Sequence, residues 1–492
     1  MQVYECPTSV EAFDMTSNEP RVLIVAEHAS ASFGGEAALP FHYFRILRQR
    51  QIEVWMVVHE RTRDELRRSL GADFDRIHFI ADTSLHLFLH WLCQFLPQRL
   101  AHFTLGFMLR LMTQAAQRRL AKQLVQRYQI TVVHQPIPVS PKEPSLIFGV
   151  DAPVIIGPMN GGMDYPPAFQ KMQSRFVHVT LSAGRLLSKW LNWLIPGKRQ
   201  AAMLLVANAR TRAALPKGVC SNIVELCENG VDLSVWQQKP EKNSIEATHP
   251  LPMPAVQTVA QATKFVFVGR LLNWKAVDLL LLAFERVAKQ MPVVLEIIGD
   301  GPESLALKQQ AMALGLRSLS EPHAMDQGQP GNEPQTVERA VAKLHPDSAV
   351  HFLGWLSQAD CAQRLWESDV MVLPSLLECG GAAVLESMSI GLPVIATNWG
   401  GPMDYLDESC GILVEPQSPA SFVDGLAAAM SRLASSPSLR RSMGKAGRQR
   451  VLSHFDWEVK VDNILEIYRD VMPMPLLKQP AMSQRTAGKA VR

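Results

Sequence analysis

The chain of 492 residues lacks the features that mark several common protein classes. Its seven cysteines contain no CxxC pair, and an odd number cannot be joined completely in disulfides. The net charge of +3 is small, and no array of aromatic and basic side chains resembles a nucleic-acid platform. We therefore expect no nucleic-acid partner and a reducing, cytoplasmic environment.

Uninterrupted apolar runs are also missing. Residues 1–15 carry acids and no basic region before an apolar stretch, unlike a secretory signal. From Thr83 to Gln117 there are no acids, but Pro97, Arg99 and Arg110 keep the run below the roughly 20 residues that a membrane span requires. We expect the chain to start inside the cell and not to cross a membrane.

One segment, 182–199, has the pattern of an amphipathic helix. Its apolar side comprises Leu186, Leu187, Trp190, Leu191 and Leu194, and its polar side comprises Arg185, Ser188, Lys189 and Asn192. Basic residues with tryptophans at the edge are typical of helices that lie on anionic lipid. A helix that packs its apolar side on the core has the same pattern. The sequence leaves both readings open, and the first predicts peripheral contact with the inner face of the cell membrane.

Short apolar strands alternate with helical stretches in both halves of the chain, which predicts an α/β fold of two Rossmann-like, doubly wound domains. We expect ligands in the cleft between the domains, at the carboxyl ends of the strands. The expected division is an N-terminal domain (1–235), a linker (236–263), a C-terminal domain (264–455) with a surface insertion (318–346), a terminal helix (456–472) that packs back on the N-terminal domain, and a basic, disordered tail (473–492).

The run LPSLLECGGAAVLESMSIGLPVIAT (373–397) places a glycine turn between a buried strand and a helix. The start of a helix binds phosphate through unpaired backbone N–H groups and the helix dipole. Glu378 and Glu386 flank this turn, and carboxylates repel phosphate but accept hydrogen bonds from hydroxyls. The combination predicts a site for a diphosphate with sugar hydroxyls on both sides, which is a nucleotide-sugar.

The run VGRLLNWK (268–275) places Arg270 just beyond a strand and Lys275 at the start of a helix. Two cations there would stabilise the negative charge that grows on a departing diphosphate. Each residue taken alone is more often a solvated surface group. Together they predict a second part of the same anion site.

These motifs, in this order, resemble the retaining glycosyltransferases of the GT-B fold, in particular the family-four or group 1 type. The similarity extends to IIGDGPE (297–303), VHFLGWL (350–356) and GILVEP (411–416), and more weakly to FGGE (33–36), VVHQP (132–136) and ENGVD (228–232). An ordered set of this kind is more specific than a lone glycine motif.

The resemblance assigns roles to individual residues. It implies that Glu386 binds the ribose, that Glu378 holds the transferred sugar, and that Arg270 and Lys275 clamp the diphosphate and act in catalysis with Glu378. The remaining donor-side residues that it implies are Gly34, Gly35, Gly380, Gly381 and Ala382, and His134 is expected beside the sugar. The family commonly has a bulky aromatic residue inside the glycine turn, where this chain has none.

Three further positions have two interpretations each. His134 follows a strand and could project into the cleft, although a single histidine is usually structural. Trp355 could contact the base, or it could be part of the core. Asn160, in the run IGPMNGGMDYPP (156–167), could line the acceptor side or make a tight turn.

The resemblance implies a hexosyl transfer from a nucleotide-sugar, with UDP favoured over GDP, to a saccharide or lipid-linked acceptor in polysaccharide or glycolipid synthesis. No pair of carboxylates is left to act as in a retaining hydrolase. We therefore expect front-face attack, with no cofactor and no metal, since Asp73 and Asp75 lie far from the glycine turns. The alternatives are a nucleotide-sugar epimerase or hydrolase of similar fold, and a non-catalytic membrane-associated scaffold.

Overall fold

The computed structural model describes residues 19–31, 35–95, 104–172, 187–238, 262–316 and 344–472. Several expectations lie wholly or mainly outside the described residues. These are the assignment of Gly34, the linker 236–263, the insertion 318–346, the first five residues of segment 182–199 and the tail 473–492.

The N-terminal lobe is built on a seven-stranded sheet in the order β3-β2-β1-β4-β5-β6-β7, with all neighbours parallel. Its strands are β1 (Val22–Val25), β2 (Val54–His59), β3 (Ile77–Ile80), β4 (Val132–Gln135), β5 (Val154–Met159), β6 (Met203–Val206) and β7 (Ile223–Glu225). Four of them, β1, β2, β4 and β5, are buried along their whole length, as expected for parallel strands covered on both faces. Alternate residues of β1 and β2 enter two separate apolar clusters, one on each face of the sheet.

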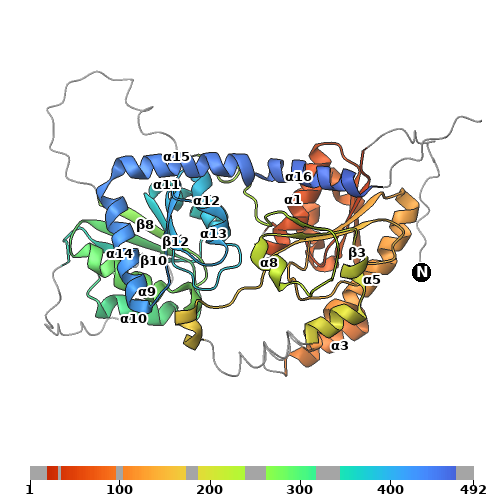
Figure 1. The fold of residues 1–492 in the computed structure, drawn as a ribbon, viewed down its shortest axis with the longest axis horizontal. Helices are drawn as coiled ribbons and strands as arrows, with labels where there is room; N and C mark the ends of the chain where they lie inside the picture. Colours follow the sequence, from red (N-terminus) through yellow and green to blue (C-terminus); the bar gives the residue numbers. More distant parts are fainter. Residues whose placement is uncertain are drawn as a thin grey trace, which may run out of the picture.

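Helices cover both faces of this sheet (Figure 1). They are α1 (Gly35–Gln49), α2 (Arg63–Leu70), α3 (Ser84–Cys93), α5 (Leu105–Tyr128), α7 (Gly197–Gln200) and α8 (Ala209–Ala214), with 3-10 turns η1 (Glu60–Thr62), η2 (Gly71–Arg76) and η3 (Pro167–Met172). Residues 187–194 are also helical.

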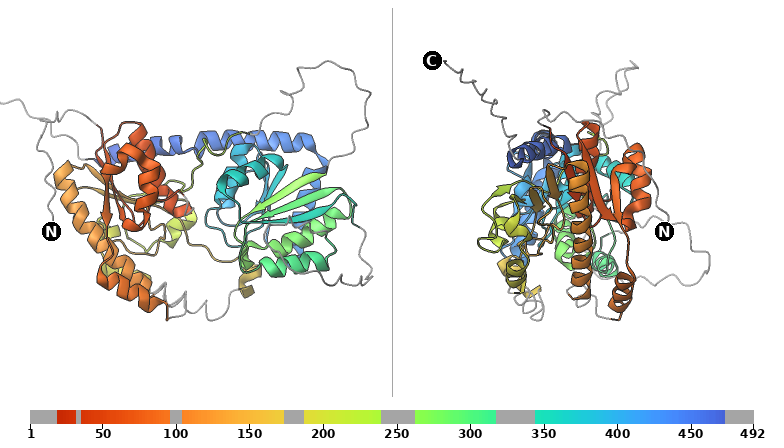
Figure 2. Two further views of the ribbon diagram at one scale, coloured as in Figure 1. Left: turned by 180° about the vertical axis from the view of Figure 1, so that it is seen from behind. Right: turned by 90° about the vertical axis from the view of Figure 1, so that its right-hand side faces the viewer.

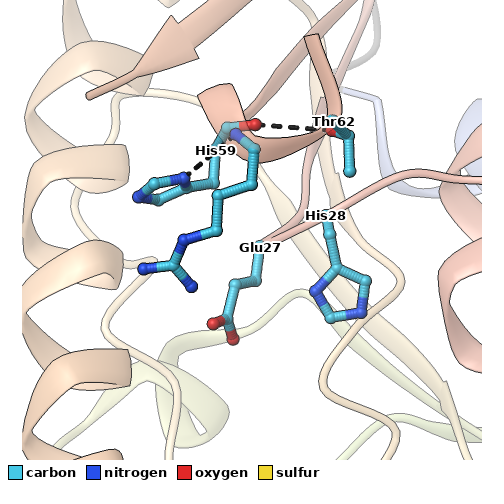
Figure 3. A pocket seen from close by; sticks show the side chains of 5 residues that line it. Glu27, His28, His59 and Thr62 are labelled. Atoms are coloured by element: carbon cyan, nitrogen blue, oxygen red, sulfur yellow. Dashed lines mark hydrogen bonds between the residues drawn. The ribbon is translucent and has the colours of Figure 1, made fainter. Parts of the chain in front are cut away.

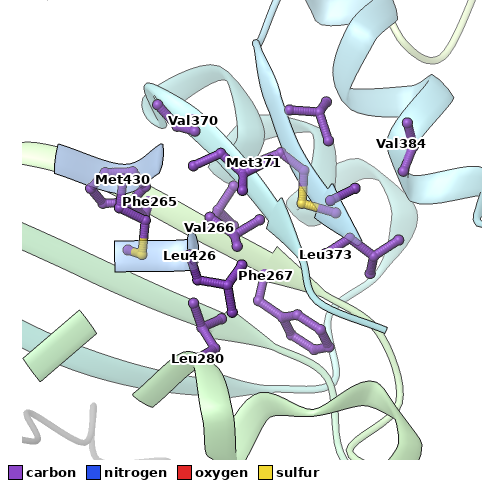
Figure 4. Close-up of a cluster of buried hydrophobic side chains, with 14 of the residues drawn as sticks. Phe265, Val266, Phe267, Leu280, Val370, Met371, Leu373, Val384, Leu426 and Met430 are labelled. Atoms are coloured by element: carbon purple, nitrogen blue, oxygen red, sulfur yellow. The ribbon is translucent and has the colours of Figure 1, made fainter. Parts of the chain in front are cut away.

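The C-terminal lobe repeats the architecture with a six-stranded parallel sheet in the order β10-β9-β8-β11-β12-β13. The strands are β8 (Thr263–Val268), β9 (Val293–Ile298), β10 (Ala349–Gly354), β11 (Val370–Leu373), β12 (Val394–Thr397) and β13 (Gly411–Val414). The helices are α9 (Val277–Ala288), α10 (Ser304–Ala313), α11 (Gln358–Glu367), α12 (Ala382–Ile390), α13 (Pro402–Tyr405), α14 (Pro419–Ser435), α15 (Pro437–His454) and α16 (Trp457–Val471), with the 3-10 turn η6 (Asn273–Lys275). One apolar core holds β8 and β11 together (Figure 4).

The end of the described chain returns to the N-terminal lobe. Figure 1 and the left panel of Figure 2 show α15 and α16 running along one edge of the molecule, from one lobe to the other. Trp457 of α16 stacks on His42 of α1 with ring centroids 4.7 Å apart, and Arg50 pairs with Glu458 at 2.6 Å. The last helix therefore fastens the two lobes together.

The expected α/β fold of two Rossmann-like domains is confirmed by the two parallel sheets with helices on their faces. In the described part of the chain, no helix combines the length and the apolar character that crossing a membrane requires.

Candidate donor site between the lobes

The site of interest lies where the strand order of the C-terminal sheet reverses. β8 and β11 are neighbours there, and their following connections run in opposite directions across the sheet. In open α/β sheets, ligands bind outside the carboxyl ends of the strands at such a point. The loop after β8 carries Arg270 and Lys275, and the loop after β11 carries Glu378 and the glycine turn.

Lys275 and Glu378 are joined directly. The Lys275 Nζ donates to Oε2 of Glu378 in an ion pair, and each side chain is 15% exposed. Gly401 N–H donates to the Glu378 carbonyl oxygen at 2.8 Å, which fixes the backbone of the same residue. The structure thus brings together two of the predicted site residues that lie more than one hundred positions apart in the sequence.

The glycine turn begins α12 without a side-chain cap. Gly381 occupies the N-cap position with φ +89°, a conformation that glycine adopts at little cost, and within the described part of the chain the helix has no side-chain cap. Ala382 is the first helical residue. Val384 N–H donates to the Gly381 carbonyl oxygen at 2.9 Å, so among the described residues the N–H groups of Ala382 and Ala383 are left for a ligand, as an anion site requires.

Gly380 is the point where the N-terminal lobe touches the turn. A methyl group at Gly380 would lie 2.2 Å from Asn229 Nδ2 and 2.7 Å from Glu228 Oε1. The absence of a side chain thus lets the 228–229 segment close on the turn. This contact gives a physical reason for a glycine at position 380.

Residues of the N-terminal lobe hold the glycine turn by hydrogen bonds. Asn160 donates to the buried Glu228 carboxylate and, at 2.9 Å, to the Cys379 carbonyl oxygen. Asn229 donates to the Tyr405 hydroxyl at 2.8 Å, and burial raises the pKa of Glu228. Asn160 therefore bridges the two lobes, which the sequence left open. The role of Glu228 and Asn229 was missed, although the run ENGVD was a signal for it.

Glu386 lies in the second turn of α12 and is partly buried. Burial raises the pKa of its carboxyl to about 7. A carboxyl group with a raised pKa changes readily between its neutral and charged forms near pH 7. Hydrogen bonds from the hydroxyl groups of a ligand would favour the charged form, so Glu386 is a candidate acceptor for such bonds.

Arg270 is exposed on the loop after β8. Within the described residues it makes no hydrogen bond or ion pair with Lys275, Glu378 or Glu386. Its position beside Gly269 keeps it at the same sheet edge, since a methyl group on Gly269 would lie 3.9 Å from Lys275 Cε. The structure therefore joins Lys275 to Glu378 and places Arg270 near them without a direct contact.

The start of α1 approaches the site from the N-terminal lobe. Gly35 is the first residue of α1, with φ +25° and open space around its Cα. Burial raises the pKa of the neighbouring Glu36 carboxyl, and nearby carboxylates, including Glu228, raise it further. The Glu36 charge also acts on Cys379, so the α1 start and the glycine turn face the same region.

His134 does not project into the cleft, and this expectation is corrected. Its ring is fully buried, with Nδ1 2.6 Å from the Tyr468 hydroxyl of α16 and Nε2 2.6 Å from the Gly157 carbonyl oxygen. Burial lowers the pKa of His134 to about 4, so the ring is neutral near pH 7. Nδ1 fastens α16 to the sheet and Nε2 joins β4 to its neighbour β5, so neither nitrogen is free for a substrate.

Trp355, whose core interpretation was left open, is 78% exposed just beyond β10. The core alternative is wrong, and the ring is available to stack on a planar group. Asp73 pairs with Arg48 at 2.8 Å in the N-terminal lobe. The described residues include no group of three or more His, Cys, Asp or Glu side chains arranged to hold a metal ion. Metal independence remains a prediction.

A cavity of about 320 Å³ lies at the carboxyl ends of β1 and β2 (Figure 3). Its lining consists of Glu27, His28, His59, Arg61 and Thr62. Burial lowers the pKa of both histidines, which leaves neutral imidazoles. The sequence analysis missed this cavity. A signal existed, since polar residues directly follow two buried strands of a parallel sheet.

The sequence model of the family described as "Glycosyl transferases group 1" matches residues 255–319 and 328–450. Among curated proteins, the D-inositol 3-phosphate glycosyltransferase of Saccharomonospora viridis is 26% identical over 223 residues, which are 44% of this chain and 45% of the relative. The corresponding protein of Kribbella flavida is 27% identical over 252 residues, half of each chain. The chain thus spans about half the length of the curated relatives it matches.

Solved structures match over nearly the whole chain. A glycosyltransferase from Rickettsia africae has a TM-score of 0.57 at 14% identity, covering 92% of this chain and 99% of its own. HepE from Anabaena, solved in complex with UDP, has a TM-score of 0.56 at 13% identity, covering 92% and 100%. At this identity the likeness shows the fold, and it confirms the expected arrangement of two domains.

Proposed function

We propose that the protein is a retaining hexosyltransferase of the group 1 glycosyltransferases, because the sequence model of that family matches residues 255–319 and 328–450 and a solved glycosyltransferase shares the fold of the chain. It transfers a sugar from a nucleotide-sugar, preferably a UDP-sugar, to a saccharide or lipid-linked acceptor in polysaccharide or glycolipid synthesis. It works in the cytoplasm, at the inner face of the cell membrane, without a metal or a cofactor.

The observation that carries this proposal is the Lys275–Glu378 ion pair beside the uncapped start of α12. The donor diphosphate binds the free N–H groups of α12, and Lys275 turns from Glu378 to the phosphate. Arg270 completes the clamp. Glu378 is then released to accept a hydrogen bond from the transferred sugar. A cation held in a partly buried pair is already in place when charge develops on the leaving group.

The nucleoside end of the donor lies along α12. Glu386 accepts hydrogen bonds from the ribose hydroxyls, and the exposed Trp355 supplies a stacking surface for the base. UDP is favoured because HepE, a neighbour in fold, was solved with UDP. Gly35, at the start of α1, approaches the diphosphate from the opposite lobe, and the family resemblance implies the same role for Gly34.

The acceptor approaches from the N-terminal lobe. The cavity at the carboxyl ends of β1 and β2, with Glu27 and the neutral His28, offers hydrogen-bond partners for acceptor hydroxyls. Attack occurs on the face from which the diphosphate leaves, and the donor phosphate takes the proton of the acceptor hydroxyl. The protein contributes positioning and charge stabilisation.

Calorimetric titration with UDP-glucose, UDP and GDP tests the donor assignment. We expect UDP-glucose to bind, Glu386→Ala to weaken binding, and Arg270→Ala to lower turnover with little change in binding. If none of the three ligands binds, the alternative of a non-catalytic scaffold would be favoured. Rapid conversion of UDP-glucose without an acceptor would favour the epimerase or hydrolase, whereas retention of activity in EDTA supports the metal-free mechanism.

A further inference from the structure

Exposed apolar side chains concentrate at one end of the N-terminal lobe. Ten of the seventeen large apolar side chains that are exposed in the described residues belong to three neighbouring stretches of chain. They are Leu85, Leu87, Phe88, Trp91 and Phe95 on and just after α3, Met108 near the start of α5, and Leu187, Trp190, Trp193 and Leu194 on the helical segment 187–194. We refer to these ten residues as the apolar end. Figure 1 shows α3 and the segment 187–194 at the lower end of this lobe.

The segment 187–194 is anchored by its polar side. Ser188 Oγ and Asn192 Nδ2 both donate to the Lys142 carbonyl oxygen, at 2.6 and 2.9 Å, and both side chains are buried. The buried Lys198 Nζ donates to the Pro141 carbonyl oxygen at 2.8 Å. The apolar side therefore faces away from the protein, and the interpretation that this helix packs its apolar side on the core is wrong.

α3 presents an aromatic row in the same manner. Phe88 and Trp91 stack with centroids 6.0 Å apart, and Phe95 meets Trp91 edge-on at 4.8 Å. The two buried side chains of this helix are His86 and Leu89. Packing among exposed aromatics fixes their orientation but leaves each of them more than half exposed.

The two helices belong to one connected surface. α3 packs against α5, and Arg110 of α5 pairs with Glu143 at 2.8 Å. Glu143 directly follows Lys142, whose carbonyl oxygen holds the segment 187–194. The relative position of the two apolar faces is thus set by a short chain of packing and polar contacts.

The stretches of chain that carry the apolar end contain no acidic residue, and Glu143, which lies close by, is paired with Arg110. No Asp or Glu occurs from Thr83 to Lys142, and none occurs from Tyr165 to Val224. Lys189 and Arg199 are exposed beside the tryptophans. Tryptophan and leucine flanked by lysine and arginine match the interface of a bilayer that contains anionic lipids.

We propose that the apolar end is a docking surface for a bilayer that contains anionic phospholipid. α3 and the segment 187–194 lie in the interface, and their tryptophans sit at the level of the headgroups. A second copy of the chain fits less well, because a two-fold contact would bring two basic surfaces together without acidic partners. The proposal does not depend on the proposed glycosyl transfer, but it would bring the acceptor lobe next to a lipid-linked acceptor.

Vesicle flotation tests the docking surface. Vesicles of phosphatidylcholine and phosphatidylglycerol in equal parts are compared with vesicles of phosphatidylcholine alone. The double variant Trp91→Glu, Trp190→Glu changes one residue on each helix. The matched control is Leu305→Glu, Met312→Glu on α10 of the other lobe, where the two side chains are 68% and 61% exposed.

We expect the wild type and the control to float with the mixed vesicles, and the double variant to lose binding at least about tenfold. Weaker binding to phosphatidylcholine alone is also expected. Equal binding of the double variant and the wild type would overturn the proposal. The proposal would also be overturned if the wild type binds neither kind of vesicle and sediments as a dimer, while the double variant sediments as a monomer.

Calorimetry with UDP-glucose on the double variant separates this proposal from the proposed function. Unchanged nucleotide binding together with lost vesicle binding supports the docking surface and shows that the variant is folded. The same titration on the wild type tests the donor site independently of any membrane.

Discussion

The two lobes share one architecture but bring different things to the site. The C-terminal lobe supplies an uncapped helix start and a cation, Lys275, at the reversal point of its sheet. The N-terminal lobe supplies polar side chains, Asn160 and Asn229, that hold the glycine turn and its surroundings from the other side. In the proposed function, the C-terminal lobe thus carries the anion chemistry, whereas the N-terminal lobe carries the positioning residues and an exposed apolar end.

This difference explains where substitutions should hurt. The donor side depends on backbone geometry and on one charge, so that single changes there should act on turnover. The N-terminal side is held by many hydrogen bonds and apolar contacts, so that changes there should act first on stability. The five predictions that follow probe this contrast, from the largest expected effect on activity to the smallest.

Lys275→Ala should lower kcat by about 100-fold or more, as is typical when one charge-stabilising donor is removed. The reason is the loss of the cation beside the α12 start. Lys264→Ala is the matched control, because Lys264 lies on β8 of the same lobe and only approaches Glu296, at 4.0 Å. Steady-state kinetics should show near wild-type turnover for Lys264→Ala. Equal losses in both variants would remove the distinction that the donor site implies.

Gly380→Phe should reduce kcat/KM by on the order of tenfold or more, since overpacking costs roughly 1–3 kcal/mol. The side chain would collide with Asn229 and Glu228, so that the lobes could not close on the turn. The double variant Gly380→Phe, Asn229→Gly opens space and should recover part of the loss. No recovery would mean that the 228–229 contact does not set the requirement for glycine.

The affinity for UDP-glucose should depend on pH through Glu386. The pKa of this carboxyl is about 7 in the free protein, and hydroxyl donors favour its charged form, so binding releases a proton. Affinity should therefore rise with pH through 7, by about tenfold from about pH 6 to pH 8. Calorimetry at several pH values measures this change in affinity. Glu386→Gln should abolish the dependence, and a pH profile that persists in this variant would point to another group.

His134→Phe should change the turnover of the folded enzyme by less than about twofold. Its effect falls on stability, where it should cost about 1–3 kcal/mol because Tyr468 and the Gly157 carbonyl oxygen lose their partner. Urea unfolding measures the loss, and the partly exposed His345→Phe serves as the control. A large drop in kcat without a drop in stability would restore His134 to the catalytic site.

The pKa of His134, lowered to about 4 by burial, adds a pH signature to its structural role. A histidine whose folded pKa lies below its usual 6.5 stabilises the fold above that value. The free energy of unfolding should therefore fall as pH drops from about 6.5 towards 4. His134→Phe should show a weaker fall over the same range.

The sequence predicted the fold, and it predicted that Lys275 and Glu378 lie close together, for a physical reason. Parallel strands buried on both faces appear as apolar runs, and a helix start that binds an anion needs glycine, so both leave local signals. The loops after β8 and β11 could be paired because strand ends meet at one edge of a sheet. His134 could not be placed, because its environment is set by Tyr468, which lies 334 positions away. The outward orientation of the apolar side of segment 187–194 depends on hydrogen bonds to the Lys142 carbonyl oxygen, and no sequence pattern reveals these bonds.

A crystal structure of the protein with UDP bound tests the central claim most directly. We predict that the diphosphate lies at the start of α12, within hydrogen-bonding distance of the N–H groups that follow Gly381, and that Lys275 Nζ has left Glu378 for a phosphate oxygen. A complex in which the Lys275–Glu378 pair stays closed while UDP binds elsewhere would contradict the account.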